Sequence, residues 1–140
     1  MTDTEQVIDQ LDLRPLLDSP IGTLSKGQRK RTLLAIGLLM PQPVLMADEP
    51  FDGLDLRQSR DVARTLRTYA DAGKTLFLSI HQITDAARVC DRFILLSGGR
   101  MCGEGTLDEL TALASARPST GSGQGGSAPA DLEEVFLALT

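Results

Sequence analysis

The sequence predicts an α/β protein with parallel strands flanked by helices, a short antiparallel hairpin and a C-terminal helix. Three observations predict this class. Residues 44–47 and 75–80 are short, mainly apolar runs, which is the pattern of strands buried in a parallel sheet. Amphipathic stretches separate these runs, so strands and helices alternate along the chain. Gly98-Gly99 then divides two further strand-like runs and predicts a hairpin turn.

The N-terminal part of the chain predicts two helices. Residues 5–17 place apolar side chains among acidic and polar ones, as in a short amphipathic helix that breaks near Pro15. Residues 25–40 predict a second helix, because Ser25 is a favourable N-cap and the residues that follow become strongly apolar. Pro41 cannot continue a helix and marks its end.

The middle of the chain predicts a helix, a short helix and the hairpin, in that order. Residues 56–72 have one apolar face, and Gly73 is a natural helix end. Residues 84–90 fit a short helix. Residues 92–97 and 100–102 are the two strands of the hairpin, so the first of them is also the third strand of the fold.

The C-terminal part predicts two helices on either side of a linker. Residues 106–113 begin with the capping-box pattern Thr-x-x-Glu. Residues 115–130 are rich in Gly, Ser, Pro and Ala and predict a flexible linker. Residues 131–140 then predict a small amphipathic helix. We therefore expect a main domain of residues 1–114, the linker and a closing helix.

Composition limits the functions that are compatible with the chain. Its 140 residues suffice for one modest domain, and 14 basic against 19 acidic residues argue against a nucleic-acid partner. Cys90 and Cys102 match no zinc or redox spacing, so we expect no disulfide partner for either. No apolar run approaches the ~20 residues of a membrane-spanning helix, and the first ten residues lack a secretion signal. These features predict a cytoplasmic location.

Two glycine-containing segments resemble nucleotide-binding motifs only in their letters. Residues 121–126 fit G-x-G-x-x-G but lie in the linker, whereas that motif requires a preceding strand and a following helix. Gly73-Lys74-Thr75 resembles the end of a P-loop, yet Thr68 stands where the first P-loop glycine is needed. This segment also follows a helix and precedes a strand, the reverse of a P-loop. The sequence therefore contains no P-loop.

Three titratable side chains follow the predicted parallel strands. Asp48 and Glu49 come directly after the first strand and His81 comes directly after the second. Ligands of open α/β sheets bind at this carboxyl edge. One acid can hold Mg²⁺ through oxygen and retained waters, the other can activate a water molecule, and the imidazole can contact a phosphate. An acid pair at the start of a loop and an ordinary surface histidine remain the alternative interpretation.

The start of the second predicted helix is a candidate anion site. Ser25 and Gly27 lie where backbone N–H groups and the positive end of the helix dipole face outward. Gly27 allows close approach of a phosphate, and Ser25 adds a hydroxyl donor. A plain helix N-cap explains the same residues.

Taken together, these motifs resemble the ATP-binding cassette (ABC) ATPase family. LSKGQ resembles the family's signature, usually LSGGQ; VLMADE resembles its Walker B strand; DGLD resembles its D-loop; and the histidine after TLFLSI resembles its switch histidine. The likeness covers roughly residues 5–110, in the family's order and spacing. It implies a partial P-loop NTPase fold, and the final ten residues resemble the closing helix of exporter-type subunits.

The resemblance also implies roles for individual residues. Glu49 and His81 would be catalytic, the first polarising the attacking water and the second contacting the γ-phosphate of ATP. Asp48 would hold Mg²⁺. A nucleotide held by the opposite subunit would be contacted by the signature residues and the D-loop aspartate, which are Ser25, Lys26, Gly27, Gln28 and Asp55. Lys26 departs from the commoner glycine, and its side chain could crowd the interface.

The family's first half, which carries the P-loop, has no counterpart in this sequence. We therefore expect the C-terminal part of an ABC ATPase, as a fragment, a truncated product or half of a split protein. Its partners would be a second cassette and a transmembrane permease subunit, on the inner face of the membrane. The isolated chain should be nearly inactive, because P-loop amides and lysine make most phosphate contacts.

Two alternatives remain open. The chain could be a non-enzymatic accessory half-site that docks on a complete ABC cassette and offers it only the LSKGQ helix and the D-loop. It could also be an independent enzyme that uses Asp48, Glu49 and His81 as metal ligands. One histidine and two adjacent acids leave such a site short of ligands, which argues against the second alternative.

Overall fold

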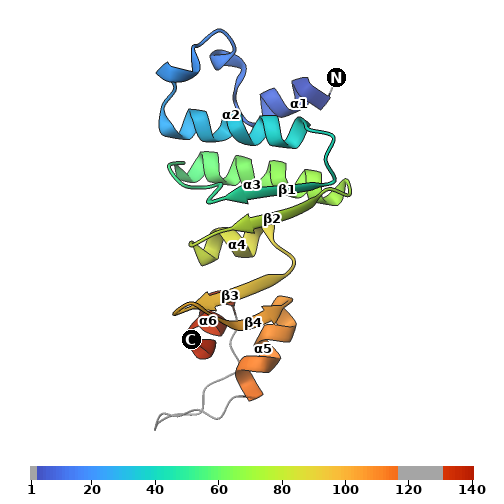
Figure 1. Cartoon of the computed structure of the whole chain (residues 1–140), viewed down its shortest axis with the longest axis vertical. Helices are drawn as coiled ribbons and strands as arrows, with labels where there is room; N and C mark the ends of the chain where they lie inside the picture. Colours follow the sequence, from blue (N-terminus) through green and yellow to red (C-terminus); the bar gives the residue numbers. More distant parts are fainter. Residues whose placement is uncertain (1–2, 117–130) are drawn as a thin grey trace. The chain divides into compact units, whose positions relative to one another are not determined.

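The computed structural model of the protein describes residues 3–116 and 131–140. The chain divides into two compact units, Met1–Asp85 and Ala86–Thr140, and each is described here by itself. Figure 1 shows the order of helices and strands along the chain. Most of the predicted linker, including residues 121–126, lies outside the described residues.

Three helices form the hydrophobic core of the first unit (Figure 1). They are α1 (Asp3–Gln10), α2 (Lys26–Leu39) and α3 (Leu56–Asp71), and α1 contacts both of the others. Apolar positions spaced three and four residues apart meet between them, as expected for amphipathic helices. The side chains that are almost completely buried there are those of Val7, Leu11, Leu34, Leu38, Val62 and Leu66.

The predicted helix over residues 5–17 is wrong in its extent. The helix α1 ends at Gln10, and a separate 3₁₀ turn, η1, covers Arg14–Leu16. Asp12 between them has a φ of 51°, a left-handed conformation that ends a helix. Pro15 lies inside the 3₁₀ turn, so the break comes earlier than the proline on which the prediction relied.

Arg31 of α2 holds the end of α1. Its side chain is buried, and its Nη1 donates hydrogen bonds to the carbonyl oxygens of Leu11 (2.6 Å) and Asp12 (3.2 Å). Helix C-terminal carbonyls lack partners within the helix, and a cation also complements the helix dipole there. Arg31 therefore supplies from α2 the cap that α1 does not build itself.

The predicted parallel pairing is confirmed. Strand β1 (Val44–Asp48) pairs with β2 (Thr75–Ser79), and Asp48 lies opposite Ser79 at the carboxyl end. The expected burial is only half right, because alternate side chains are exposed. Val44 is 50%, Met46 72% and Phe77 54% exposed, whereas their neighbours along the strands are partly buried. Within the described residues, only one face of this two-stranded sheet is covered by helices.

The second unit contains the predicted hairpin and two helices. Strand β3 (Phe93–Ser97) pairs antiparallel with β4 (Arg100–Gly105), and it does not extend the parallel sheet as the alternation of elements predicted. Gly98 and Gly99 have φ values of 54° and 74°, so they form the tight turn that a hairpin requires. The chain therefore returns directly, and β3 finds its partner in β4, which is longer than predicted.

The boundary between the units falls within α4 (Ile83–Val89). Helices α5 (Leu107–Ala116) and α6 (Leu132–Leu139) pack together in the second unit. The capping box that begins α5 is confirmed: Thr106 N–H donates to Glu109 Oε2 (2.7 Å) and Glu109 N–H to Thr106 Oγ1 (3.3 Å). In residues 3–116 and 131–140, no helix is long and apolar enough to cross a membrane.

Candidate functional site

The carboxyl edge of the parallel strands gathers the three titratable residues predicted there. Asp48 is the last residue of β1, and the N–H of Glu49 donates to the carbonyl oxygen of Ser79 on β2 (3.0 Å). The two acids point to different partners. The Asp48 carboxylate accepts a short hydrogen bond from the Ser79 hydroxyl, and the Glu49 carboxylate lies 2.5 Å from Nδ1 of His81.

Glu49 is held in an unusual backbone conformation. Its φ is 47°, in the left-handed region that residues other than glycine seldom adopt. Such a residue costs of order 1–3 kcal/mol and persists only where its surroundings hold it. Here the bond to Ser79 and a turn bond from Asp52 N–H to the Glu49 carbonyl (3.1 Å) hold it. In this conformation the Glu49 carboxylate lies beside His81.

The contact with Glu49 determines which nitrogen of His81 is available. An ionised carboxylate only accepts hydrogen bonds, so Nδ1 carries a proton in this pair. The His81 N–H also points to the same carboxylate oxygen, at 3.4 Å. Nε2, the other ring nitrogen, remains for another partner. The His81 side chain is exposed, so a ligand can reach it.

The start of α2 has a complete capping box. Gln28 N–H donates to Ser25 Oγ (3.2 Å), and Ser25 N–H donates to Gln28 Oε1 (2.8 Å). These bonds satisfy two of the N–H groups that a helix start leaves without partners within the helix. The N–H groups of Lys26 and Gly27 are the other two that the first turn leaves without a partner within the helix. The helix cap expected from the sequence is therefore confirmed. The anion-binding tip stays a prediction, and the cap leaves it open because the two would use different atoms.

The loop of residues 52–55 lies against the start of α2. A β-carbon built on Gly27 would lie 2.8 Å from the Gly53 carbonyl oxygen, so only glycine fits this approach. Lys26 Nζ forms an ion pair with Asp52 Oδ2 at 2.7 Å. The hydrogen bond and charge of Lys26 lower the pKa of the Asp52 carboxyl below its usual range.

Asp55 has a structural role that the sequence analysis missed. It is the N-cap of α3, where Gln58 N–H donates to Asp55 Oδ1 (2.8 Å) and Asp55 N–H donates to Gln58 Oε1 (3.2 Å). The signal was present as Asp-x-x-Gln before an apolar helix face, which is a variant of the capping box. The carboxylate that the D-loop resemblance singled out therefore also fixes the start of α3.

A basic groove lies along the first half of α2. It is open, has a volume of about 350 Å³, and is lined by Lys26, Arg29, Lys30 and Leu33. Lys30 Nζ also donates to the carbonyl oxygen of Asp48 (3.2 Å), so it ties α2 to the end of β1. Lys30 and Arg29 were not predicted as site residues. Lys26 is paired with Asp52, so Arg29 and Lys30 are the cations of this groove that favour a negatively charged ligand such as a phosphate.

The strand edge fits Mg²⁺ only as part of a larger ligand set. In the part of the chain that the structure describes, no group of three or more His, Cys, Asp or Glu side chains could hold a metal ion. Mg²⁺ commonly keeps several waters and takes one or two carboxylates together with substrate phosphates. Asp48 suits that pattern, and the independent metal enzyme is not supported by the described residues.

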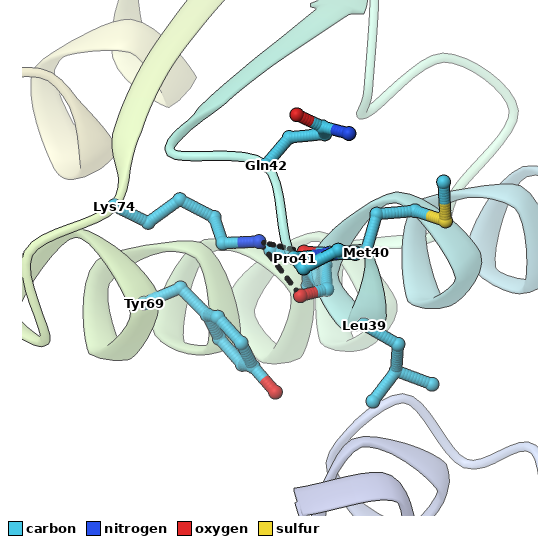
Figure 2. A pocket seen from close by; sticks show the side chains of 7 residues that line it. Leu39, Met40, Pro41, Gln42, Tyr69 and Lys74 are labelled. Carbon is cyan, nitrogen blue, oxygen red and sulfur yellow. Dashed lines mark hydrogen bonds between the residues drawn. The ribbon is translucent and has the colours of Figure 1, made fainter.

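Lys74 has a structural role that differs from that of a P-loop lysine. Its Nζ donates to the carbonyl oxygens of Leu38 (2.9 Å) and Met40 (2.8 Å) at the end of α2, and it lies 5.9 Å from the centre of the Tyr69 ring (Figure 2). The pocket around it has a volume of about 260 Å³. Helix α3 precedes the segment and β2 follows it, so the order excludes a P-loop, as predicted.

The fold is a mixed α/β fold of the P-loop NTPase class, as comparison with solved structures shows. A solved ATP-binding subunit of an ABC transporter superposes with a TM-score of 0.76 at 26% identity, over 96% of this chain and 51% of that chain. A bacterial ABC transporter cassette solved as a dimer gives a TM-score of 0.65 at 25% identity, over 74% and 45% of the two chains.

Sequence comparison gives the same result. The ABC transporter family model matches residues 2–52. A phosphonate import ATP-binding protein of Nostoc sp. is 37% identical over 108 residues, which are 76% of this chain and 44% of the relative. The chain belongs to the ABC transporter ATP-binding family, and it spans less than half the length of this relative.

Proposed function

We propose that the chain is the C-terminal part of an ABC ATPase, and that it supplies the catalytic edge and the signature to Mg-ATP hydrolysis. The observation that carries this proposal is the contact between Glu49 and His81 beyond the paired ends of β1 and β2. The paired strands bring Glu49, a candidate base, and His81, a candidate hydrogen-bond donor to phosphate, to the edge where α/β sheets bind ligands.

In this proposal each residue at the edge has a separate role in hydrolysis. Glu49 orients and polarises the water that attacks the γ-phosphate. His81 donates a hydrogen bond from Nε2 to a γ-phosphate oxygen, while its Nδ1–H stays hydrogen-bonded to the Glu49 carboxylate. Asp48 would hold Mg²⁺, largely through water, and the ion would supply positive charge to neutralise the phosphates. The hydrogen bond from Ser79 keeps the Asp48 carboxylate in one orientation.

The start of α2 would serve a nucleotide held by the opposite subunit. The N–H groups of Lys26 and Gly27, with the helix dipole, offer an anion site that the basic groove extends. Ser25 and Gln28 hold the first turn in shape and contact the nucleotide at its rim. Asp55 follows in the D-loop and joins the two composite sites.

We also propose that a P-loop-bearing segment must complete the site. The sequence has no P-loop, and the chain matches less than half of its relative's length. The exposed side chains Val44, Met46 and Phe77 support this proposal, because apolar residues of a parallel sheet are normally covered on both faces. Without that segment the chain should bind Mg-ATP weakly and turn it over negligibly.

The proposed partners are a second cassette and a transmembrane permease subunit. The dimeric cassette among the similar structures supports the first, and the importer among the relatives supports the second. Assembly with a permease would place the chain on the inner face of the membrane. The exporter-type branch remains a prediction.

A second candidate function is the accessory half-site. The capped tip of α2 and the loop of residues 52–55 are fully formed within the first unit, so they could complete a nucleotide site on another cassette. The two functions differ in their need for Glu49. An accessory half-site uses only the tip and the D-loop, whereas an ATPase part also uses the strand edge.

The test mixes the full chain with a complete related cassette whose own signature serine has been replaced. A rise in Mg-ATP hydrolysis is expected, and Ser25→Arg should abolish it because a bulky cation blocks the tip. Ser25→Thr is the matched control, since threonine also caps a helix. This rise should persist in Glu49→Gln, because both functions offer the complete cassette only the tip and the D-loop. Turnover that appears on mixing with a P-loop-bearing half and is lost in Glu49→Gln indicates the ATPase part, and its absence indicates the accessory half-site. No rise with the unaltered chain would refute both.

A further inference from the structure

Lys26 joins the start of α2 to the loop of residues 52–55 through both parts of its side chain. Its ammonium group lies 2.7 Å from Asp52 Oδ2. Its alkyl stem runs over Gly53, because a β-carbon built on Gly53 would lie 3.1 Å from Lys26 Cδ and 3.3 Å from Cγ. The Lys26 side chain therefore lies along the loop, with its stem over Gly53 and its ammonium group at Asp52.

The loop that Lys26 contacts is a tight turn. Asp52 N–H donates to the Glu49 carbonyl (3.1 Å) and Leu54 N–H donates to the Phe51 carbonyl (3.2 Å). Gly53 has a φ of 80°, and its carbonyl oxygen faces Gly27 on α2. Two contacts hold this turn against the first turn of α2. They are the close approach of the Gly53 carbonyl to Gly27 and the ion pair between Asp52 and Lys26.

We propose that Lys26 is a positioning residue that holds the loop of residues 52–55 against the tip of α2. The tip and the D-loop then form one preassembled surface for the nucleotide of the opposite subunit. That nucleotide-binding role of the surface rests on the proposed function. The ammonium group of Lys26 is committed to Asp52, so the contact with phosphate falls to the N–H groups of Lys26 and Gly27. A lysine at a position where glycine is commoner thereby gains a specific role.

The expected effect is modest. The side chains of Lys26 and Asp52 are 70% and 44% exposed, and ion pairs in such positions are weak and screened by salt. We expect loss of the ion pair to raise the equilibrium constant for opening of the loop about 2- to 5-fold. Lys30 and His81 also face Asp52 and lower the pKa of its carboxyl, but less than Lys26 does.

The experiment measures two nuclear magnetic resonance signals of the full chain without nucleotide. The first is the carboxyl titration of Asp52, and the second is the hydrogen exchange of the Leu54 amide. In Lys26→Gly, the pKa of Asp52 should rise toward its usual value and Leu54 exchange should accelerate about 2- to 5-fold. Lys26→Arg should preserve both signals, because arginine keeps the charge and most of the length.

Two further variants separate the ion pair from general effects. Arg29→Gln removes a cation from the same groove and should leave both signals unchanged. The reversed pair, Lys26→Asp with Asp52→Lys, should restore slow exchange of Leu54. Unchanged signals in Lys26→Gly, or fast exchange in the reversed pair, would overturn the proposal. Both signals are measured without nucleotide. The Lys26 proposal can therefore be refuted while the hydrolysis test supports the proposed function, and it can be supported while that test fails.

Discussion

Alanine substitutions at two glycines of α2, Gly27 and Gly37, should have opposite effects on stability. A β-carbon at either position would lie 2.8 Å from its nearest neighbour. At Gly27 that neighbour is the backbone carbonyl oxygen of Gly53, and at Gly37 it is Cδ1 of Leu45. The Leu45 side chain is only partly buried and can rotate away, whereas a backbone oxygen moves only with its loop.

The two costs can be compared with the gain in helix propensity. Replacing glycine by alanine inside a helix stabilises it by about 1 kcal/mol, and Gly37 lies in the interior of α2. Forcing an extra carbon into a filled contact costs about 1–3 kcal/mol. Gly37→Ala should therefore leave the free energy of unfolding unchanged or raise it by up to about 1 kcal/mol. Gly27→Ala, in the first turn, should lower it by about 1–2 kcal/mol.

Urea unfolding of the full chain, followed by circular dichroism, measures both changes. Gly22→Ala is the control, because a β-carbon there meets nothing within 4 Å. The slope of the unfolding free energy with urea should be the same for all variants, so that the midpoints can be compared directly. Equal stability of Gly27→Ala and Gly37→Ala would refute the close approach of the 52–55 loop to α2.

Three further predictions follow from single residues. Glu49→Gly should be more stable to urea than Glu49→Ala by about 1 kcal/mol, because glycine adopts a positive φ without strain; the opposite order would contradict the backbone described here. Arg31→Met should lower the free energy of unfolding by about 2–3 kcal/mol, because the buried carbonyl of Leu11 and the partly buried carbonyl of Asp12 lose charged hydrogen bonds; a change below about 0.5 kcal/mol would exclude that role. The pKa of Asp52 is lowered in the folded state, chiefly by the hydrogen bond and charge of Lys26. Its ion pair with Lys26 therefore stabilises the fold above pH 3.8, the ordinary pKa of the carboxyl, and this contribution is lost as the pH falls through the lowered pKa. Asp52→Asn should therefore remove part of the loss of stability below pH 3.8, and identical acid unfolding of both proteins would disprove the pair.

Local patterns in the sequence predicted most elements correctly. Ser25 and Thr106 begin helices through capping boxes, and Gly98-Gly99 forms the hairpin turn. These features depend on residues that are neighbours in the chain, so the sequence alone contains the information. The end of α1 was not predictable in this way, because its cap comes from Arg31, nineteen residues after Asp12.

The burial of the parallel strands could not be derived from their composition. Val44–Asp48 is apolar enough for a fully buried strand, yet Met46 is 72% exposed. An apolar run indicates that a strand is suited to burial, but the surrounding elements decide which face is covered. The exposed face is therefore the part of the fold where the sequence and the described structure disagree most.

The site was predictable in its residues and only partly in its contacts. Placing Asp48, Glu49 and His81 at one edge required only the order of strands and the rule for parallel sheets. The bonds from Lys30 to Asp48 and from Lys26 to Asp52 join residues that are 18 and 26 positions apart. No periodicity or motif encodes such pairs, and they depend on how α2 packs against the strand ends.

The central claim is that this chain carries the catalytic edge of an ABC ATPase and needs a P-loop from another segment. Its most direct test is the Mg-ATP turnover of the purified chain, alone and after mixing with the P-loop-bearing half of a related cassette. We predict no turnover by the chain alone, turnover on mixing, and its loss in Glu49→Gln. Turnover by the chain alone that Glu49→Gln abolishes would contradict the account.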